Sequence, residues 1–280
     1  MKILQNARAY DERRAQPEFQ QASLTTDLPE LESARHYVSG YWIYSRLCRA
    51  NATPASLPVV LVHGLGVSSR YMIPAARYLA KAYSVYAPDL PGFGKSSRPA
   101  HTLDIAELAV TLKEWLDTVG LEKVILYANS MGCQVVTEFA LRYPHRVDRL
   151  IMSGPTVDPA ARSYIQQALR IVSDFIYEPP SLFFICLYDY LTAGPLRTLL
   201  TGRAALHDHI EDRLPLIKLP TLIVRGEHDT IAPEKWIEKA TSLLPDSGLV
   251  RIPEVGHAIN YNSPQALAEI IELFTATRGS

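Results

Sequence analysis

The chain has 280 residues, of which 48% are hydrophobic, and this is enough to bury the core of one large domain. Its formal net charge is −1 and its lysines and arginines are scattered, which argues against a nucleic-acid-binding protein. No stretch contains the roughly 20 apolar residues that a membrane-spanning helix needs, and the N-terminus lacks the apolar core of a secretory signal.

The three cysteines, Cys48, Cys133 and Cys186, are odd in number and far apart in the sequence. This spacing fits neither a disulfide framework nor a zinc site. We therefore expect reduced thiols in a cytoplasmic protein that uses no metal and no other cofactor. Cys133 is expected to be a buried helix thiol, because no activating group lies beside it in the sequence.

Residues 1–35 are polar and weakly patterned, and we expect an N-terminal extension there. Residues 35–48 favour a β-hairpin, and buried strands then alternate with amphipathic helices. Strands are predicted at 59–64, 83–89, 123–128, 147–154 and 248–253, a strand and the loop after it at 220–229, and helices at 69–82, 103–120, 130–144, 233–244 and 263–276. Such alternation indicates an α/β fold, with helices on both faces of a mostly parallel sheet and a core formed by 36–154 and 220–280.

Residues 155–219 interrupt this alternation, because they contain helical patterns and no convincing strand. We expect them to form a helical cap inserted between two strands of the core. An apolar, aromatic run within the cap is a candidate lining for a substrate pocket, and the alternative is that it forms the cap's own core. Its residues are Phe183, Phe184, Leu187, Tyr188 and Tyr190.

Ser130 lies where a predicted strand turns into a predicted helix, with Ala128 and Gly132 two residues to either side. A sharp strand-to-helix turn exposes the apex side chain and requires small neighbours at these two positions. The free N–H groups of the helix N-terminus can then hold an oxyanion. Ser130 is therefore a candidate nucleophile, although a serine that caps a helix would have the same local sequence.

A serine nucleophile needs a base, and the base needs a group that orients it. Asp229 and His257 each follow a predicted strand in the C-terminal half, and functional residues of an open α/β sheet gather at the carboxyl ends of strands. We expect Ser130, Asp229 and His257 to form a catalytic triad. Asp158, after the strand that follows the nucleophile helix, is the rival acid.

An oxyanion hole requires two convergent N–H donors. We expect one from Met131, directly after the nucleophile, and the other from Leu65 in the loop after the strand at 59–64; Gly66 and Val67 are alternatives. His63 is expected to be buried and to order this loop by hydrogen bonding.

Together the segments "HGLG" (63–66), "DLPGFGKSSRP" (89–99), "ANSMG" (128–132), "RGEHDTIAP" (225–233) and "VGHAI" (255–259) resemble the α/β-hydrolase superfamily. The resemblance runs from about residue 35 to the C-terminus and is weakest in the cap. It implies a sheet of about eight strands with a cap over the site. It also implies that Ser130 forms an acyl-enzyme, that His257 transfers the proton, and that Asp229 holds the imidazolium.

The segment "NSMG" is similar to the turn in the carbon–carbon-bond hydrolases that cleave ring-fission products of aromatic degradation, where an Asn precedes the nucleophile. Asn129 occupies that position, and the resemblance implies a substrate-binding role for it. Those enzymes usually have Trp after the catalytic His, whereas this chain has Ala258. They also use a cap Arg to bind a substrate carboxylate, for which Arg197 and Arg203 are candidates.

We therefore expect a serine hydrolase that cleaves small to medium carboxylic esters. The alternatives are a carbon–carbon hydrolase acting on a ring-fission-type diketone, or a ligand-binding receptor on the hydrolase scaffold. An aspartate-nucleophile dehalogenase or epoxide hydrolase is disfavoured because the apex residue is Ser130. The expected partner is a small-molecule ester, with neither nucleic acid nor membrane, and a homodimer is left open.

Overall fold

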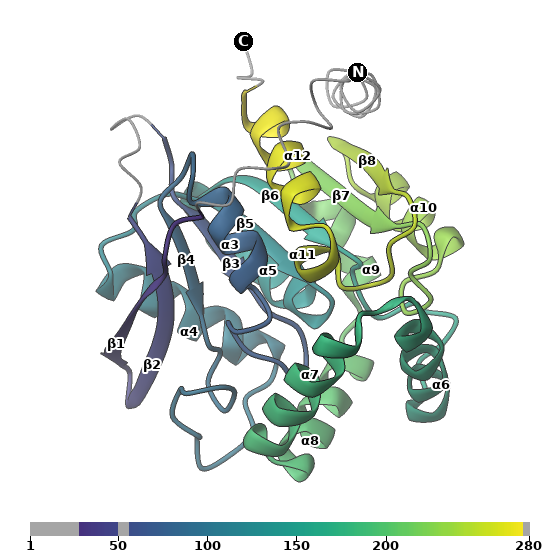
Figure 1. Ribbon diagram of the computed structural model, residues 1–280, viewed down its shortest axis with the longest axis horizontal. Helices are drawn as coiled ribbons and strands as arrows, with labels where there is room; N and C mark the ends of the chain where they lie inside the picture. Colours follow the sequence, from purple (N-terminus) through teal and green to yellow (C-terminus); the bar gives the residue numbers. More distant parts are fainter. Residues whose placement is uncertain (1–27, 50–55, 277–280) are drawn as a thin grey trace.

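The computed structural model describes residues 28–49 and 56–276 of the chain. Its centre is an eight-stranded sheet in the order β1-β2-β4-β3-β5-β6-β7-β8 (Figure 1). The strands are β1 (Glu32–Val38), β2 (Tyr41–Cys48), β3 (Val59–Val62), β4 (Val85–Pro88), β5 (Val124–Asn129), β6 (Val147–Ser153), β7 (Thr221–Gly226) and β8 (Ser247–Ile252).

The sheet is mostly parallel, as the alternating pattern predicted. β2 runs antiparallel to both β1 and β4, and each of the other neighbouring pairs is parallel. β1 begins at Glu32 and so includes the last four residues of the range expected as an N-terminal extension. The earlier part of that range, residues 1–27, lies outside the described residues.

The central strands are buried on both faces because their side chains alternate between two hydrophobic layers. In β3, Val60 and Val62 pack into one layer, and Val59 and Leu61 pack into the other. Such strands are continuous apolar runs in the sequence, which explains why periodicity located them. The expected eight-stranded α/β fold is confirmed.

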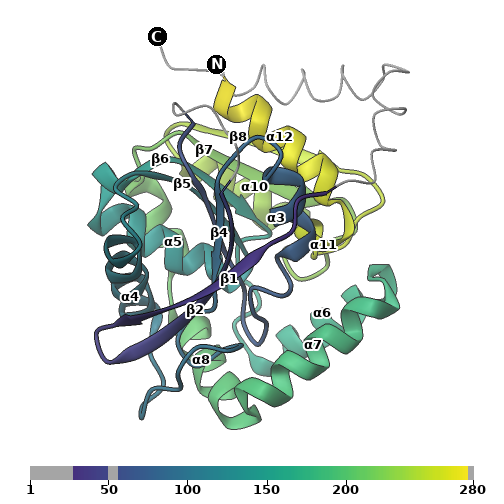
Figure 2. The same cartoon turned by 60° about the vertical axis from the view of Figure 1, so that its left-hand side comes forward.

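Helices cover both faces of the sheet (Figures 1 and 2). Trp115 of α4, Phe139 of α5 and Trp236 of α10 pack into one layer, and Leu79 of α3 and Phe274 of α12 pack into the other. The helices of the core are α3 (Ile73–Leu79), α4 (Ile105–Thr118), α5 (Met131–Arg142), η2 (Pro144–Arg146), α10 (Glu234–Leu243), α11 (Ile259–Asn262) and α12 (Pro264–Ala276).

Between β6 and β7 the chain is helical, and we call residues 155–219 the cap. Its helices are α6 (Tyr164–Asp174), η3 (Phe175–Tyr177), α7 (Pro180–Ala193), α8 (Pro195–His207), α9 (Ile210–Arg213) and η4 (Leu214–Leu216). In Figure 1, α6, α7 and α8 lie together below the sheet, on the side where the loops after the parallel strands emerge. Within the described ranges, no helix is long and apolar enough to cross a membrane.

Candidate active site

Ser130 lies at the sharp turn between β5 and α5, in a backbone conformation that is strained for a residue with a side chain. Its φ is 58° and its ψ is −127°. The turn is held by hydrogen bonds at both of its ends: the Ser130 N–H donates to the Ser153 carbonyl over 3.0 Å, and the Cys133 N–H donates to the Ser130 carbonyl over 2.9 Å. This is the geometry of a turn that presents its apex side chain.

The small residue two positions after Ser130 is required by close packing. A Cβ on Gly132 would lie 2.6 Å from the carbonyl oxygen of Val62 and 2.8 Å from that of His63. Backbone atoms cannot move aside at such distances, so α5 can start beside β3 only with glycine there. Ala128, two residues before Ser130, is fully buried in the same layer.

His257 and Asp229 form a buried pair. The His257 Nδ1–H donates to Asp229 Oδ2 over 2.8 Å, and the other oxygen, Oδ1, accepts from the N–H groups of Ile231 and Ala232 over 2.9 and 2.8 Å. The carboxylate is thus fixed by the backbone and in turn fixes the imidazole ring. His257 Nε2 is buried and has no hydrogen-bond partner among the described residues, so it is the nitrogen left for a substrate or nucleophile proton.

The end of β6 brings the three residues together. Ser153 accepts from the Ser130 N–H, and a Cβ on the next residue, Gly154, would lie 2.6 Å from His257 Cε1 and 2.8 Å from Asp229 Oδ2. Ser130, Asp229 and His257 therefore each lie next to Ser153 or Gly154, at the carboxyl end of β6.

Asp158, the rival acid, is engaged elsewhere. Its Oδ1 accepts from the Ala160 N–H over 2.9 Å, and its Oδ2 accepts from Arg170 over 2.7 Å. The carboxylate that is bonded to the imidazole is that of Asp229.

The charge around His257 favours its protonated form. Burial lowers the pKa of the imidazole, but Asp229, followed by Asp174 and Glu178, more than offsets this and raises it from 6.5 to about 9. An imidazolium next to carboxylates is therefore stabilised, as an intermediate that places the serine proton on His257 requires.

His63 is buried and orders its loop, as expected. Its Nδ1–H donates to the Gly64 carbonyl over 2.8 Å, and its Nε2 accepts from the Leu90 N–H over 2.9 Å. Burial also lowers the pKa of His63, so the neutral ring joins the loop after β3 to the loop after β4. Both nitrogens are occupied, and His63 is not a candidate base.

The two residues expected to supply the oxyanion hole belong to segments that adjoin Ser130. Met131 is the first residue of α5, where an N–H has no partner within the helix. Leu65 follows Gly64, whose Cβ position is 3.0 Å from Ser130 Cβ. The loop after β3 therefore packs directly on the candidate nucleophile, and the role of the Leu65 and Met131 amides in binding an oxyanion remains a prediction.

Asn129, for which a substrate-binding role is expected, is buried, and both polar atoms of its side chain form hydrogen bonds within the protein. Its Oδ1 accepts from the Tyr71 hydroxyl over 3.2 Å, and its Nδ2 donates to the carbonyls of Ser153 and His257 over 3.3 and 3.2 Å. The side chain thus links the turn at Ser130 to the backbone of His257.

The cap residues expected to line a pocket are largely exposed, including Phe184 at 68% and Tyr188 at 53%. Phe183 packs edge-on against Phe175 and Phe184, with ring centroids 5.7 Å apart in each pair, and the guanidinium of Arg70 lies 4.2 Å from the centre of the Tyr188 ring. Leu187 is exposed in the same helix. The expectation that these side chains form the buried core of the cap is wrong, whereas their role in binding substrate remains a prediction.

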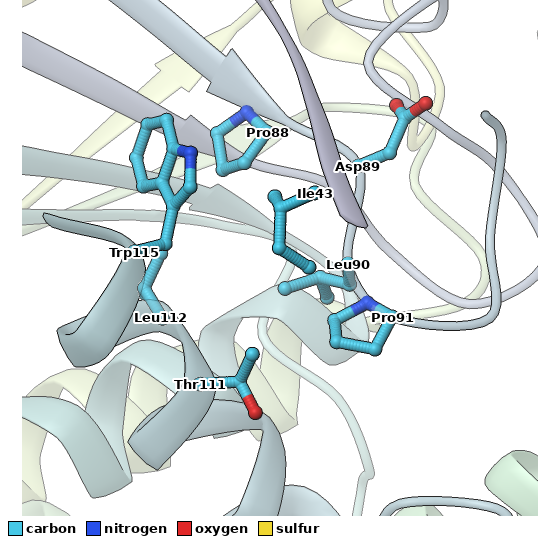
Figure 3. Close-up of a pocket in the computed structure, with 8 residues that line it drawn as sticks. All are labelled: Ile43, Pro88, Asp89, Leu90, Pro91, Thr111, Leu112 and Trp115. Atoms are coloured by element: carbon cyan, nitrogen blue, oxygen red, sulfur yellow. The ribbon is translucent and has the colours of Figure 1, made fainter. Parts of the chain in front are cut away.

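A cavity at the end of β4 is a packing defect in the apolar layer. Figure 3 shows Ile43, Leu112 and Trp115 around it, with the Asp89 carboxylate directed away from the Trp115 indole. That carboxylate accepts from the N–H groups of Ser69 and Lys95 over 2.6 and 2.7 Å and so orders two loops next to the site. No cap residue lines this cavity.

The two cap arginines considered for a substrate carboxylate lie elsewhere. Arg197 donates to the carbonyls of Pro99 and His101 over 2.7 and 3.4 Å and joins α8 to the loop after β4. Arg203 is exposed on α8. Neither position supports the carboxylate-binding role.

Cys133 is buried, as expected, with its thiol directed at the carbonyls of Ala128 and Ser153. Burial raises its pKa, which keeps the thiol protonated.

A surface cluster of three residues, Glu227, His228 and Glu254, has possible metal-binding atoms within 4.8 Å of one another. His228 is already stacked on Tyr177 and paired with Glu254.

Comparison with known proteins gives consistent results. Residues 58–176 match the family model described as alpha/beta hydrolase fold. A 2-hydroxy-6-oxononadienedioate/2-hydroxy-6-oxononatrienedioate hydrolase of Paraburkholderia phymatum is 30% identical over 207 residues, covering 62% of this chain and 72% of the relative. An abhydrolase domain-containing protein of Caenorhabditis elegans is 40% identical over 105 residues, which are 36% of this chain and 24% of that longer protein. An esterase from Thermogutta terrifontis has the same fold, with a TM-score of 0.74, 22% identity, and coverage of 88% of this chain and 98% of its own.

Proposed function

Because this chain belongs to the α/β-hydrolase superfamily, we propose that it is a serine hydrolase that cleaves small to medium carboxylic esters through an acyl-enzyme intermediate. The observation that carries the proposal is the His257–Asp229 pair. Nδ1 of the imidazole is held by a buried carboxylate, Nε2 has no partner among the described residues, and Ser130 lies at a strained turn that is bonded to Ser153, next to the glycine against which the imidazole packs. This is the arrangement in which an imidazole activates a hydroxyl group.

The reaction proceeds in two halves. Ser130 Oγ attacks the ester carbonyl while His257 Nε2 takes its proton, and the N–H groups of Met131 and Leu65 bind the resulting oxyanion. The imidazolium, stabilised by Asp229, gives the proton to the alcohol oxygen as the C–O bond breaks. Water then attacks the acyl group on Ser130 with His257 again as the base, and the imidazolium returns the proton to Ser130 Oγ as the acid leaves.

The composition of the cap surface supports apolar substrates. Apart from Tyr37 and Trp42, every large hydrophobic side chain that is exposed in the described part of the chain belongs to the cap. Exposed apolar surface gathered beside a site usually marks a surface that binds something apolar. We therefore propose that the acyl or alcohol group of the ester is apolar and contacts α6, α7 or α8.

The proposal is tested by the release of p-nitrophenol from p-nitrophenyl acetate and butyrate. The wild-type protein should hydrolyse both esters, and Ser130→Ala should lose the activity while keeping its circular dichroism spectrum and melting temperature. Binding of the esters without release would favour a receptor. Hydrolysis by Ser130→Ala at the wild-type rate would overturn the proposal.

A carbon–carbon hydrolase is the second candidate, and Asn129 before the nucleophile together with the Paraburkholderia phymatum relative favours it. Ala258 after His257 and the engagement of Arg197 by loop carbonyls argue against it. A vinylogous ring-fission diketone, assayed beside the two esters, separates the candidates. Faster turnover of the diketone than of either ester would favour the second candidate.

A further inference from the structure

Two carboxylates of the cap bind the backbone of the loops that carry Asp229 and His257. Asp174, at the end of α6, is 4% exposed; its Oδ1 accepts from the Thr230 N–H over 3.2 Å and its Oδ2 from the His257 N–H over 3.3 Å. Glu178 accepts from the Ala258 N–H over 3.0 Å and from Asn262 Nδ2 over 2.5 Å. The backbone N–H groups that they bind belong to His257 itself and to Thr230 and Ala258, which directly follow Asp229 and His257 in the sequence.

We propose that Asp174 and Glu178 are positioning residues of the active site, which hold the imidazole of His257 in place and connect the cap directly to the catalytic pair. The proposal rests on the proposed function, because it assigns these two residues a part in the same reaction.

The local structure of the cap directs both carboxylates to one place. The single turn of η3 separates Asp174 from Glu178, and both side chains reach the segment around His257. The approach is close: a Cβ on Gly256 would lie 2.6 Å from Glu178 Oε1 and 3.2 Å from Tyr177 Cβ. The cap therefore contacts the residue directly before the catalytic histidine.

Helix α6 buries a carboxylate against the core and leaves its apolar side chains exposed, which is the reverse of ordinary helix packing. Asp174 is the buried residue of α6, whereas the apolar side chains of Ile165, Leu169 and Val172 in that helix are exposed. Burying a carboxylate is costly, and a negative charge at a helix C-terminus opposes the helix dipole. A leucine at this position would pack at lower cost but could not accept the N–H groups of Thr230 and His257. The helix is thus held to the core mainly through polar contacts with the catalytic loops.

The same carboxylates also contribute charge. Asp229, Asp174 and Glu178 all favour the protonated imidazole and together outweigh the effect of burial on the pKa of His257. The pKa of Glu178 is itself raised to about 7, first by its burial and then by the nearby Asp174. Tyr71 and Cys186 also face Glu178, and burial followed by nearby acidic groups, Glu178 among them, raises the pKa of both.

The test compares four variants of the full chain: Asp174→Asn, Asp174→Ala, Glu178→Gln and, as the control, Asp208→Asn. Asp208 is a half-buried carboxylate of the cap, and its side-chain hydrogen bonds within the described part of the chain go to Gln134 and Arg213, away from the loops that carry Asp229 and His257. For each variant, kcat and KM with p-nitrophenyl acetate are measured from about pH 6 to about pH 10. In parallel, the pKa of His257 is followed by NMR of isotope-labelled histidine, with His257→Gln to assign the resonance.

We expect Asp174→Ala to lower kcat about tenfold or more while KM for this small ester stays within about twofold, because the substrate does not touch the carboxylate. Asp174→Asn keeps one acceptor oxygen and should recover part of that loss. Because it removes a negative charge, the pKa of His257 measured by NMR should fall by about half a unit or more in this variant, and so should the apparent pKa of its kcat/KM profile. Glu178→Gln should act in the same direction. Asp208→Asn should match the wild-type protein in all of these measurements.

The outcomes separate the two proposals. If Ser130→Ala is inactive but the Asp174 and Glu178 variants match Asp208→Asn in kcat and in the pKa of His257, the positioning role is overturned. If Ser130→Ala remains active, the proposed function fails, whereas the NMR titration still decides whether Asp174 acts on His257. Should Asp174→Ala not fold, Asp174→Asn and Glu178→Gln carry the same comparison.

Discussion

Gly154 lies so close to His257 that a Cβ at this glycine would be 2.6 Å from Cε1 of the imidazole and 2.7 Å from Nδ1. The same Cβ would be 2.8 Å from Asp229 Oδ2. The hydrogen bond between Asp229 and His257 therefore passes directly over the end of β6. A side chain at position 154 is incompatible with the pair as it stands.

Gly154→Ala should accordingly lower kcat by about 100-fold, because the imidazole and the carboxylate must move apart to admit the methyl group. Gly120→Ala is the matched control: both glycines have positive φ, but a Cβ on Gly120 would meet nothing within 4 Å. Backbone strain should lower the unfolding free energy of both variants in urea by about 1 kcal/mol. Gly154→Ala should lose more, because its methyl group also displaces the buried pair, and Gly120→Ala should keep its activity. Equal kcat values in the two variants would show that the close approach has no catalytic consequence.

The assignment of the acid can be tested by exchanging one atom. Asp229→Asn replaces the carboxylate that accepts from the His257 Nδ1–H by an amide, which no longer stabilises an imidazolium. We expect kcat to fall by a factor of about 10⁴, as it does for the same change in a Ser-His-Asp triad. Asp158→Asn disturbs only the contacts with Ala160 and Arg170 and should change kcat less than about threefold. A large loss in Asp158→Asn with a small one in Asp229→Asn would exchange their roles.

The pH dependence of the reaction follows from the charge around His257. The base must be neutral to accept the serine proton, and the pKa of His257 is raised from 6.5 to about 9 by Asp229, Asp174 and Glu178 against the opposing effect of burial. At neutral pH the protonated form therefore predominates, so kcat/KM should rise as pH increases and level off above about 9. Steady-state rates with p-nitrophenyl acetate, corrected for spontaneous hydrolysis, measure this profile. A profile that is already flat above pH 6.5 would contradict the charge assignment.

The buried strands and the residues that follow them were predictable from the sequence, because both depend on the spacing of apolar residues along the chain. β5 is a continuous apolar run before Ser130, and it is buried on both faces as that run requires. Asp229 and His257 follow β7 and β8 in the chain, and parallel strands bring such positions to one edge of the sheet. The hydrogen bond between them could be anticipated on topology alone.

The contacts of the cap could not be predicted in this way. Asp174 and His257 are 83 residues apart in the sequence, and no local pattern records that a helix end of the cap binds the backbone of a core loop. For Asn129 the resemblance to carbon–carbon hydrolases implied a role in binding substrate, but no feature of the sequence tells which way its side chain points. Arg197 likewise satisfies loop carbonyls whose position depends on the assembled fold.

The proposed mechanism requires that Ser130 is the residue that becomes acylated, and covalent labelling of this residue tests it most directly. A p-nitrophenyl phosphonate ester reacts with an activated serine and leaves a stable tetrahedral adduct, which intact-mass and peptide mass spectrometry can locate. We expect one adduct per chain, on the peptide that contains Ser130, a loss of esterase activity in proportion to the labelled fraction, and no adduct in Ser130→Ala. An adduct on a different residue, or equal labelling of Ser130→Ala, would contradict the proposed mechanism.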